Sequence, residues 1–259
     1  MFSWKKLPER LVIIAHRGAS TTAPENTLAA FSQAIDAGAD AIELDVRLTA
    51  DNEVVVIHDS LLRRTTDGRG EVEKSSLTTL KIYSAGAWFH KKYSAERIPH
   101  LREVFDLVQG RVGINIELKQ KGIRPNKELL KATLAIIEEY HAHEYVLLSS
   151  FNHSLIRLVK SSDSKVSTGL LFSPFSKLSR FHLKRLNDAD TRFFLTGKRL
   201  LRKKNIEKLH QKEIKTGIYT INTEKELLKM QRFGIHCIFT DDPASIRSFM
   251  SAKIPHLGD

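Results

Sequence analysis

The stretch AIELDVRLTADNEVVVIH, residues 41–58, decides the fold that we predict. Residues 41–48 form an apolar, partly β-branched segment that we interpret as a buried strand. Residues 54–58 form a second strand-like run after a connection of only five residues. Because a parallel crossover needs about a dozen residues or more, this second run must return antiparallel to the first. Asp51 and Asn52 favour a turn between the two runs, since both residue types tolerate a left-handed backbone.

Outward from this hairpin, strand-like runs alternate with amphipathic segments. Residues 11–16 predict the first strand, and residues 26–37 predict a helix that ends at Gly38. Further strand-like runs lie at 112–118, 145–149, 166–172, 192–196, 216–221 and 237–240. Alternating strands and helices indicate a parallel sheet. With residues 54–58 set aside as a hairpin arm, eight parallel strands in about 250 residues predict an α/β fold, the (β/α)8 TIM barrel.

We interpret residues 1–259 as one domain, because no internal repeat, low-complexity tract or linker stands out. Residues 60–100 are then a small insertion that follows the second strand and its arm. The alternative is an open doubly wound sheet. Against it, no Gly-x-Gly-x-x-Gly motif follows the first strand.

Composition and charge narrow the functional classes. The chain is 41% hydrophobic and 27% charged, as in an ordinary globular protein. No stretch approaches the roughly 20 apolar residues of a membrane-spanning helix. Cys237 is the single cysteine, so no internal disulfide forms; with no apolar leader at the N-terminus, this predicts a cytoplasmic protein. A formal net charge of +11 favours anionic partners or substrates.

Three carboxylates are predicted to converge at one end of the barrel. Side chains alternate along a strand, so Glu43 and Asp45 share the face opposite the apolar residues, and Glu117 has the same placement in its own strand. We expect the acids to face the lumen near the C-terminal mouth, where such barrels carry their sites. Carboxylates this close require a proton or a cation among them. Oxygen-only ligands favour Mg2+, Ca2+ or Mn2+ over zinc.

Histidines and basic residues flank this cluster. His16 and His58 end the first strand and the hairpin arm, and imidazole suits proton transfer near neutral pH. Arg17 and Lys119 add positive charge that suits an anionic phosphoryl group. The set favours hydrolysis of a phosphate ester, in which one histidine accepts a proton and the other protonates the leaving alkoxide. The alternative is a structural ion network in which the acids pair with Arg17 and Lys119.

The chain resembles the glycerophosphodiester phosphodiesterase family, whose barrel is similar to the phosphatidylinositol phospholipase C fold. The resemblance rests on short motifs that occur in order over nearly the whole chain. They are HRG (16–18), PENT (24–27), GADAIELDV (38–46), VVVIHD (54–59), RTT-x-G-x-G (64–70), IPHL (98–101), IELK (116–119), SSF (149–151), TIN (220–222) and TDDP (240–243). A lone HRG would carry no weight, whereas the joint match is very specific.

The resemblance implies hydrolysis of a glycerophosphodiester to sn-glycerol 3-phosphate and an alcohol such as choline, ethanolamine or glycerol. Either water attacks directly or a cyclic phosphate forms first. Tyr219 stands where the family usually has a Trp, and it can still stack over a small alcohol. The implied residues are Glu43, Asp45 and Glu117 for one divalent cation, His16 and His58 for acid–base catalysis, and Arg17 and Lys119 for the phosphate.

Other polar residues receive lesser roles. We expect Asn26 and Asp59 to cap helices or to support the site from behind rather than to take part directly. Asp241 and Asp242 are expected to cap the last helix, and His153 to be a solvated surface residue.

Two alternatives for the substrate and partners stay open. A lysophospholipase D that acts on a membrane-bound lysophospholipid would use the same barrel, with the aromatic residues of 83–93 around its mouth. A catalytically inactive binding module is disfavoured, because every expected catalytic residue is present. Residues 177–204 hold ten Lys and Arg against two Asp, which suits a solvated helix surface or a contact to an anionic membrane or polyanion. No nucleic-acid-binding motif accompanies this charge, and no oligomeric state is predicted.

Overall fold

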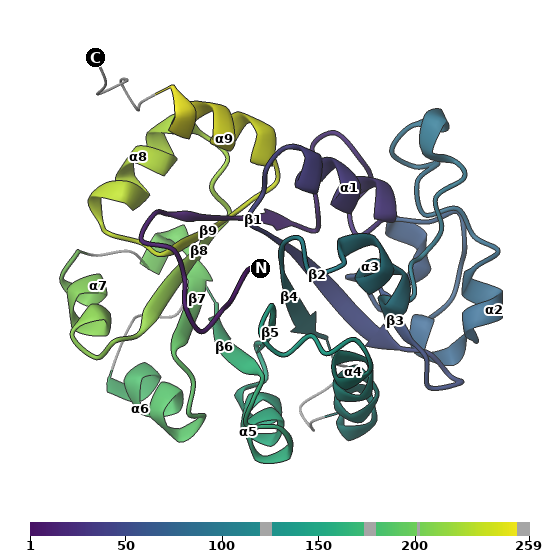
Figure 1. Cartoon of the computed structure of the whole chain (residues 1–259). Helices are drawn as coiled ribbons and strands as arrows, with labels where there is room; N and C mark the ends of the chain where they lie inside the picture. Colours follow the sequence, from purple (N-terminus) through teal and green to yellow (C-terminus); the bar gives the residue numbers. More distant parts are fainter. Residues whose placement is uncertain (120–125, 174–179, 201–202, 253–259) are drawn as a thin grey trace.

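Parallel strands close a barrel around a narrow lumen, with helices on the outside (Figure 1). The computed structural model describes residues 1–119, 126–173, 180–200 and 203–252, without the side chains of 180–183 and 200. The strands pair in the order β1-β9-β8-β7-β6-β5-β4-β2, and β1 pairs with β2 to close the ring. Their bounds are β1 Val12–His16, β2 Ala41–Leu48, β4 Gly113–Leu118, β5 Val146–Ser150, β6 Ser167–Phe172, β7 Phe193–Gly197, β8 Lys215–Tyr219 and β9 Cys237–Thr240. The predicted (β/α)8 TIM barrel is confirmed.

Helices follow the strands around the ring (Figure 1). They are α1 Leu28–Asp36, α2 Leu77–Leu80, α3 Leu101–Val108, α4 Lys127–Glu139, α5 His153–Ser162, α6 Arg180–Asp188, α7 Lys203–His210, α8 Glu224–Arg232 and α9 Pro243–Ser251, with the 3-10 turns η1 Leu62–Arg64, η2 Val72–Lys74, η3 Lys91–Tyr93 and η4 Lys198–Leu200. Polar caps set several of the helix starts. Thr27, for example, accepts a hydrogen bond from the N–H of Ala30, so α1 begins two residues later than predicted.

The hairpin arm extends the sheet beyond the barrel. Strand β3, Val54–Val56, pairs antiparallel with β2, and Asn52 takes the left-handed conformation in the turn (φ 62°). The N–H of Ile57 donates to the carbonyl of Asp45 at 2.9 Å, so the arm brings His58 to the end of β2 that carries Asp45. The short elements of 60–100 enclose a small core of their own, formed by Val55, Ile57, Leu62, Val72, Leu80, Ala85 and Ile98.

Alternation along the strands sorts the side chains between two cores. Ile42, Leu44 and Val46 of β2 lie in the main core between the barrel and the helices, as predicted. The intervening residues of β2 face the lumen, where Ala41 packs in the inner apolar cluster. The acidic residues of β2 therefore face the lumen.

The N-terminal end of the lumen is closed by an inner apolar cluster, here called the floor. It consists of Trp4, Val12, Ile14, Ala41, Leu147, Leu171, Phe193, Leu195, Cys237 and Phe239. The N-terminal segment crosses this end of the barrel (Figure 1), and its Trp4 is fully buried, with Nε1 2.9 Å from the carbonyl of Tyr145. Gly217 makes room for Leu195, since a Cβ there would lie 2.6 Å from the Leu195 side chain. Lys5 anchors the segment by an ion pair of 2.6 Å to Glu144.

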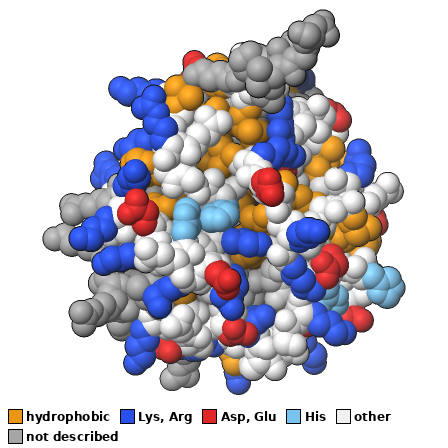
Figure 2. Space-filling model, turned by 60° about the vertical axis from the view of Figure 1, so that its left-hand side comes forward, with side chains coloured by type: hydrophobic (Ala, Val, Ile, Leu, Met, Phe, Trp, Pro, Cys, Tyr) orange, Lys and Arg blue, Asp and Glu red, His pale blue; other side chains and the backbone are white. Residues whose placement is uncertain are grey.

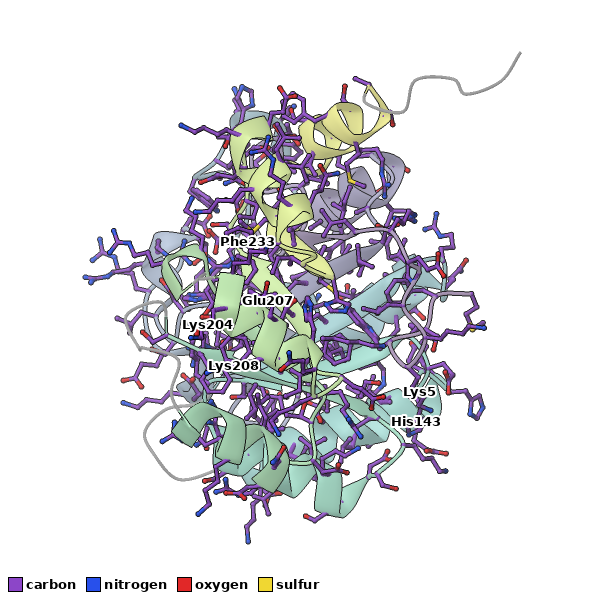
Figure 3. All side chains as sticks on the ribbon, turned by 90° about the vertical axis from the view of Figure 1, so that its left-hand side faces the viewer. Lys5, His143, Lys204, Glu207, Lys208 and Phe233 are labelled. Atoms are coloured by element: carbon purple, nitrogen blue, oxygen red, sulfur yellow. The ribbon has the colours of Figure 1, made fainter. Side chains whose placement is uncertain are left out.

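The surface carries mixed charge. On the side shown in Figure 2, Lys and Arg side chains are spread over the whole face and interrupted by Asp and Glu. Figure 3 shows this alternation on α7, where Lys204, Glu207 and Lys208 lie together, with Lys5 and His143 at another edge. The predicted basic segment 177–204 falls partly outside the described residues, at 177–179 and 201–202. In the part of the chain that the structure describes, no helix is long and apolar enough to cross a membrane.

Candidate active site

Three buried carboxylates meet at the C-terminal mouth of the barrel. Glu43 and Asp45 come from β2 and Glu117 from β4, in a parallel register that pairs Asp45 with Glu117. Oxygen atoms of the three side chains lie within 4.8 Å of one another, and all three residues are buried. The strand period of two and the register together therefore gather the predicted cluster.

The negative charges of these three carboxylates repel one another, and the nearby positive charges do not fully balance them. Burial and the neighbouring charge of Asp45 raise the pKa of Glu43 to about 8. Burial also raises the pKa of Glu117, against the attraction of Lys119. For Asp45 burial acts in the same direction, but Lys119 and Arg17 outweigh it and hold its pKa below the ordinary value. Glu43 thus retains a proton at neutral pH unless further positive charge enters the cluster.

The two basic residues lie within this cluster. Lys119 Nζ is 3.0 Å from Asp45 Oδ1 and donates to Glu117 Oε1 at 2.5 Å. Arg17 Nε is 3.3 Å from Asp45 Oδ2, and its Nη1 donates to Glu25 at 2.8 Å. Arg17 and Lys119 therefore pair with the acids, as in the ion-network alternative, yet both also line the cavity described below.

The donor set fits a hard divalent cation. Within the described residues, Asp45 Oδ1 is buried and accepts no well-formed hydrogen bond despite the nearby ammonium of Lys119. Asn115, on the same strand as Glu117, also has a buried Oδ1 that accepts no hydrogen bond from this described part of the chain. Among the same residues, the only hydrogen-bond donor to the Glu43 side chain is the backbone N–H of Arg17, at 2.9 Å. Unsatisfied oxygen atoms of this kind are the ligands of Mg2+, Ca2+ and Mn2+ in proteins.

Each of the two predicted histidines is held by a carboxylate. His16 Nδ1 lies 2.7 Å from Asp241 Oδ1, and Asp241 is fixed in turn by a hydrogen bond of 2.6 Å from Asn222. His58 Nδ1 lies 2.6 Å from Asp59 Oδ1, and Arg64 holds the other oxygen of Asp59 at 2.5 Å. These bonds fix the ring orientations and leave Nε2 of each imidazole for chemistry.

The pKa values of the two imidazoles are shifted in opposite directions. Burial alone would lower the pKa of His16, but the hydrogen bond that its ring donates to Asp241 and the charge of Glu43 outweigh it, and the pKa is raised. Burial lowers the pKa of His58, with Lys119 adding to the effect and Asp45 opposing it. Burial also disfavours the charged form of Asp59, but hydrogen bonds from Arg64 and His58 lower its pKa to about 2. Environments that separate two such groups suit a proton donor and a proton acceptor.

One cavity of about 260 Å³ brings the predicted groups together. Asp45 lies beneath it, where it contacts Arg17, Lys119 and Asn26. Tyr219 lies on its wall with the hydroxyl donating to the carbonyl of Phe172 at 2.7 Å. The lining residues are His16, Arg17, Glu43, His58, Asn115, Glu117, Lys119, Phe151, Leu171, Tyr219, Thr220 and Phe239.

The family model described as the glycerophosphoryl diester phosphodiesterase family matches residues 16–245. The chain belongs to this family. A glycerophosphodiester phosphodiesterase of Caldanaerobacter subterraneus is 36% identical over 243 residues, which cover 92% of this chain and 96% of that protein. The structure of an Oleispira antarctica phosphodiesterase in complex with the product sn-glycerol-3-phosphate is 30% identical, with a TM-score of 0.89 over 97% of this chain and 100% of the other. A glycerophosphodiester phosphodiesterase of Thermotoga maritima is 26% identical, with a TM-score of 0.77 over 92% and 98% of the two chains. The predicted family, and with it the class of enzyme, is confirmed.

Sequence reasoning misplaced one aspartate of this family member and overlooked two further residues. Asp242 caps α9 as predicted, accepting from the N–H of Ser245 at 3.0 Å. Asp241 does not cap the helix, because its carboxylate contacts His16. Glu25 and Arg64 link the two halves of the site, since Arg64 Nη1 donates to Glu25 at 2.8 Å and Glu25 also accepts from Arg17. Both residues stand inside motifs of the family resemblance, PENT and RTT, which could have singled them out.

Two further predictions concern the rim of the site. His153 is not a solvated surface residue: its Nε2 lies 3.0 Å from the carbonyl of Leu171, and its ring lies 4.7 Å from that of Phe172. The aromatic residues of 83–93 pack mainly on one another, for example Trp88 on Phe89 at 5.6 Å. None of them lines the 260 Å³ cavity.

Proposed function

We propose that the chain hydrolyses glycerophosphodiesters to sn-glycerol 3-phosphate and an alcohol, with one bound divalent cation. The proposal depends on a single observation, a 260 Å³ cavity that both histidines, two basic residues and two of the clustered carboxylates share. Mg2+ or Ca2+ is the proposed ion, with Mn2+ as a further candidate, because all the available donors are oxygen atoms.

The proposed roles follow from the contacts of each side chain. Glu43, Asp45 and Glu117 would hold the cation, which supplies charge stabilisation for a phosphoryl oxygen. Arg17 and Lys119 provide fixed positive charge at the cavity wall for the remaining phosphate oxygens.

Proton transfer falls to His16 and His58. One accepts the proton of the attacking oxygen, and the other donates a proton to the oxygen that leaves with the alcohol. The phosphorus–oxygen bond to the alcohol breaks, a bond from phosphorus to the attacking oxygen forms, and one water is consumed overall. Asp241 and Asp59 hold the two rings in place throughout.

The glycerol part of the substrate suits the inner wall of the cavity. Leu171 and Phe239 provide apolar surface there, and Tyr219 lies beside Phe239 with ring centroids 6.1 Å apart. A three-carbon alcohol with its phosphate suits a space of this size, and the Oleispira antarctica relative is described in complex with sn-glycerol-3-phosphate. We propose Tyr219 as the residue that contacts the glycerol carbon atoms.

Purified protein, incubated with a panel of glycerophosphodiesters and lysophospholipids, tests the proposal through coupled detection of glycerol 3-phosphate. We expect release from the water-soluble diesters with Mg2+ or Ca2+ present, and none in excess chelator. If no diester releases glycerol 3-phosphate with Mg2+, Ca2+ or Mn2+ present, the proposal is overturned. A lysophospholipase D would instead cleave lysophospholipids preferentially; the aromatic residues once expected at its mouth do not line the cavity.

Location, domain organisation and surface contacts are further proposals. We propose one catalytic domain over residues 1–259 and a cytoplasmic location, on the basis of the single, buried Cys237. We also propose weak contact of the segment 177–204 with anionic surfaces, because its described lysines and arginines outnumber its acids. Lys198 of this segment is already ion-paired with Glu226, which limits the charge available.

A further inference from the structure

The insertion of residues 60–100 contributes one arginine, Arg64, to the contacts behind the proposed active site. Arg64 belongs to the 3-10 turn η1, and the fully buried Leu62 anchors this turn in the small core of the insertion. The hydroxyl of Thr66 donates to the carbonyl of Leu62 at 2.8 Å and so secures the end of the turn. The Arg64 side chain therefore extends from a well-packed base.

Arg64 binds two carboxylates at once. Its Nη1 and Nη2 donate to the two oxygen atoms of Glu25, each at 2.8 Å. Its Nε donates to Asp59 Oδ2 at 2.5 Å, and Nη2 also donates to Asp59 Oδ1 at 3.2 Å. The two carboxylates thus share one nitrogen of the guanidinium. A planar guanidinium offers donors in this arrangement, whereas the ammonium of a lysine has a single nitrogen.

Each of these two carboxylates holds a residue of the proposed machinery. Glu25 Oε1 accepts from Arg17 Nη1 at 2.8 Å, and among the described residues this is the only well-formed hydrogen bond that the Arg17 guanidinium donates. Asp59 Oδ1 lies 2.6 Å from Nδ1 of His58. A continuous chain of hydrogen bonds, with Arg64 at its centre, therefore connects the guanidinium proposed to bind the phosphate with an imidazole proposed to transfer a proton.

The inner half of this chain is shielded from water. The side chains of Glu25 and Arg17 are only 14% and 19% exposed, so their contacts are screened less than those of an ordinary surface ion pair. Burial would raise the pKa of Glu25, but the hydrogen bonds from Arg64 and the charge of Arg17 outweigh it and lower the pKa. Without Arg64, the two carboxylates would lose their shared donor, and the groups that they hold would lose a fixed orientation.

We infer that Arg64 is a positioning residue that aligns Arg17 and His58 as one unit. Through Glu25 it fixes the guanidinium that receives the phosphate, and through Asp59 it fixes the imidazole that transfers the proton. The insertion thereby takes part in the reaction without lining the inner cavity. This inference rests on the proposed function of that cavity.

Steady-state kinetics with glycerophosphoglycerol separate the two arms of the unit. Arg64→Ala should lower kcat/KM by about 10–100-fold, through both a lower kcat and a higher KM, because hydrogen bonds to charged groups are about this strong. Glu25→Gln should mainly raise KM, since it affects phosphate binding, and Asp59→Asn should mainly lower kcat. The matched control is Arg63→Ala in the same turn, whose exposed side chain pairs with no carboxylate of the described residues; kcat and KM should stay within about twofold.

Residues that act as a unit lose their effect once and not twice. Adding Glu25→Gln to Arg64→Ala should therefore raise KM by less than about twofold more. If the two effects multiply in full, or if Arg64→Ala keeps kcat and KM within about twofold of the wild type, the inference is overturned.

Arg64→Lys keeps the charge and decides the question alone if Arg64→Ala does not fold, as judged by circular dichroism. It should remain at least about fivefold below the wild type in kcat/KM, because one nitrogen cannot hold both carboxylates in the same geometry. Wild-type kinetics in this variant would overturn the positioning role. A wild-type chain that hydrolyses no diester would instead overturn the proposed function.

Discussion

At the floor of the barrel, Trp4, Phe193 and Leu195 meet in a buried apolar layer, whereas at the mouth the carboxylates of Glu43 and Glu117 lie close together with too little positive charge to balance them. The same strands build both ends. Strand β1 contributes Ile14 to the floor and His16 to the site, and β2 contributes Ala41 and then Glu43. A step of two residues along one strand leads from a side chain that stabilises the core to a side chain of the proposed active site.

This difference indicates how the fold tolerates a strained site. Burial of apolar side chains at the floor stabilises the barrel by roughly 25 cal/mol per Å² of apolar surface removed from water. Burial of the carboxylates and the charge of neighbouring acids both raise the pKa of Glu43, and both oppose the stability of the mouth when the acids are ionised. Substitutions at the mouth should therefore lower turnover with little change in stability. Substitutions at the floor should lower stability with little change in turnover.

The largest effect is expected at the mouth. His16→Ala and His58→Ala should each lower kcat by about 10²–10⁴-fold, because general acid or base catalysis typically contributes that much. The melting temperature should change little, since both side chains are partly exposed. His210→Ala, at the end of α7 and outside the cavity, is the control and should retain kcat. Either variant with more than about a tenth of wild-type turnover removes that histidine from the proposed pair.

At the floor the loss should be one of stability. Trp4→Ala removes a fully buried indole and should cost about 3–5 kcal/mol in the free energy of unfolding, measured by denaturant titration. Turnover at a temperature where the variant is folded should be unchanged. The other tryptophan of the chain, Trp88, is 43% exposed, so Trp88→Ala should be the milder change. A Trp4 variant that is fully stable but inactive would reverse the comparison.

Asp241 and Asp242 are neighbours in sequence but are expected to act differently, the first on catalysis and the second on stability. Asp241→Ala should lower kcat about tenfold with little change in KM, because the ring of His16 loses its anchor. Asp242→Ala should leave kcat and cost about 1 kcal/mol of stability, because α9 loses its cap. Steady-state kinetics and thermal unfolding of both variants distinguish the roles; equal effects on kcat would refute the separation.

The floor side should also respond to acid. Burial, with His210 and Lys215 adding to it, lowers the pKa of His236 to about 4, whereas an unfolded histidine titrates near about 6.5. Between these values the unfolded chain binds more protons, so the stability present above about pH 6.5 falls as the pH drops toward 4. His236→Asn should flatten this dependence in melting curves recorded across the range. An unchanged slope would exclude His236 as its source.

The smallest effect is expected on the outer surface. Lys203→Glu/Lys204→Glu should weaken co-sedimentation with anionic vesicles at low salt and leave hydrolysis of a soluble diester unchanged. Added salt should release the wild type in the same way, since exposed charges are screened. Equal sedimentation with neutral vesicles, or none with either kind, would leave α7 as a solvated surface.

Much of the fold and the proposed site could be predicted because strand periodicity is local information. The alternation in 41–48 places Glu43 and Asp45 on one face whatever the rest of the chain does, and the short connection to 54–58 forces an antiparallel return. The family motifs then supplied roles that spacing alone could not.

The remaining contacts depend on tertiary structure. Asp241 was assigned to a helix cap because Pro243 follows it closely, but β9 lies beside β1, which brings its carboxylate to His16. His153 was predicted to be a solvated surface residue, whereas Phe172 of β6 lies against its ring at 4.7 Å. Both contacts join residues that are far apart in the chain, so the neighbouring sequence could not predict either of them.

The most direct test of the account is the number of divalent ions bound per chain, measured by elemental analysis after equilibrium dialysis against Mg2+, Ca2+ or Mn2+. The wild type should bind one ion and release glycerol 3-phosphate only in that state. Asp45→Asn/Glu117→Gln, with an unchanged circular dichroism spectrum, should bind none and release none. A wild-type chain that holds no ion and hydrolyses glycerophosphodiesters at full rate in excess chelator would contradict the account.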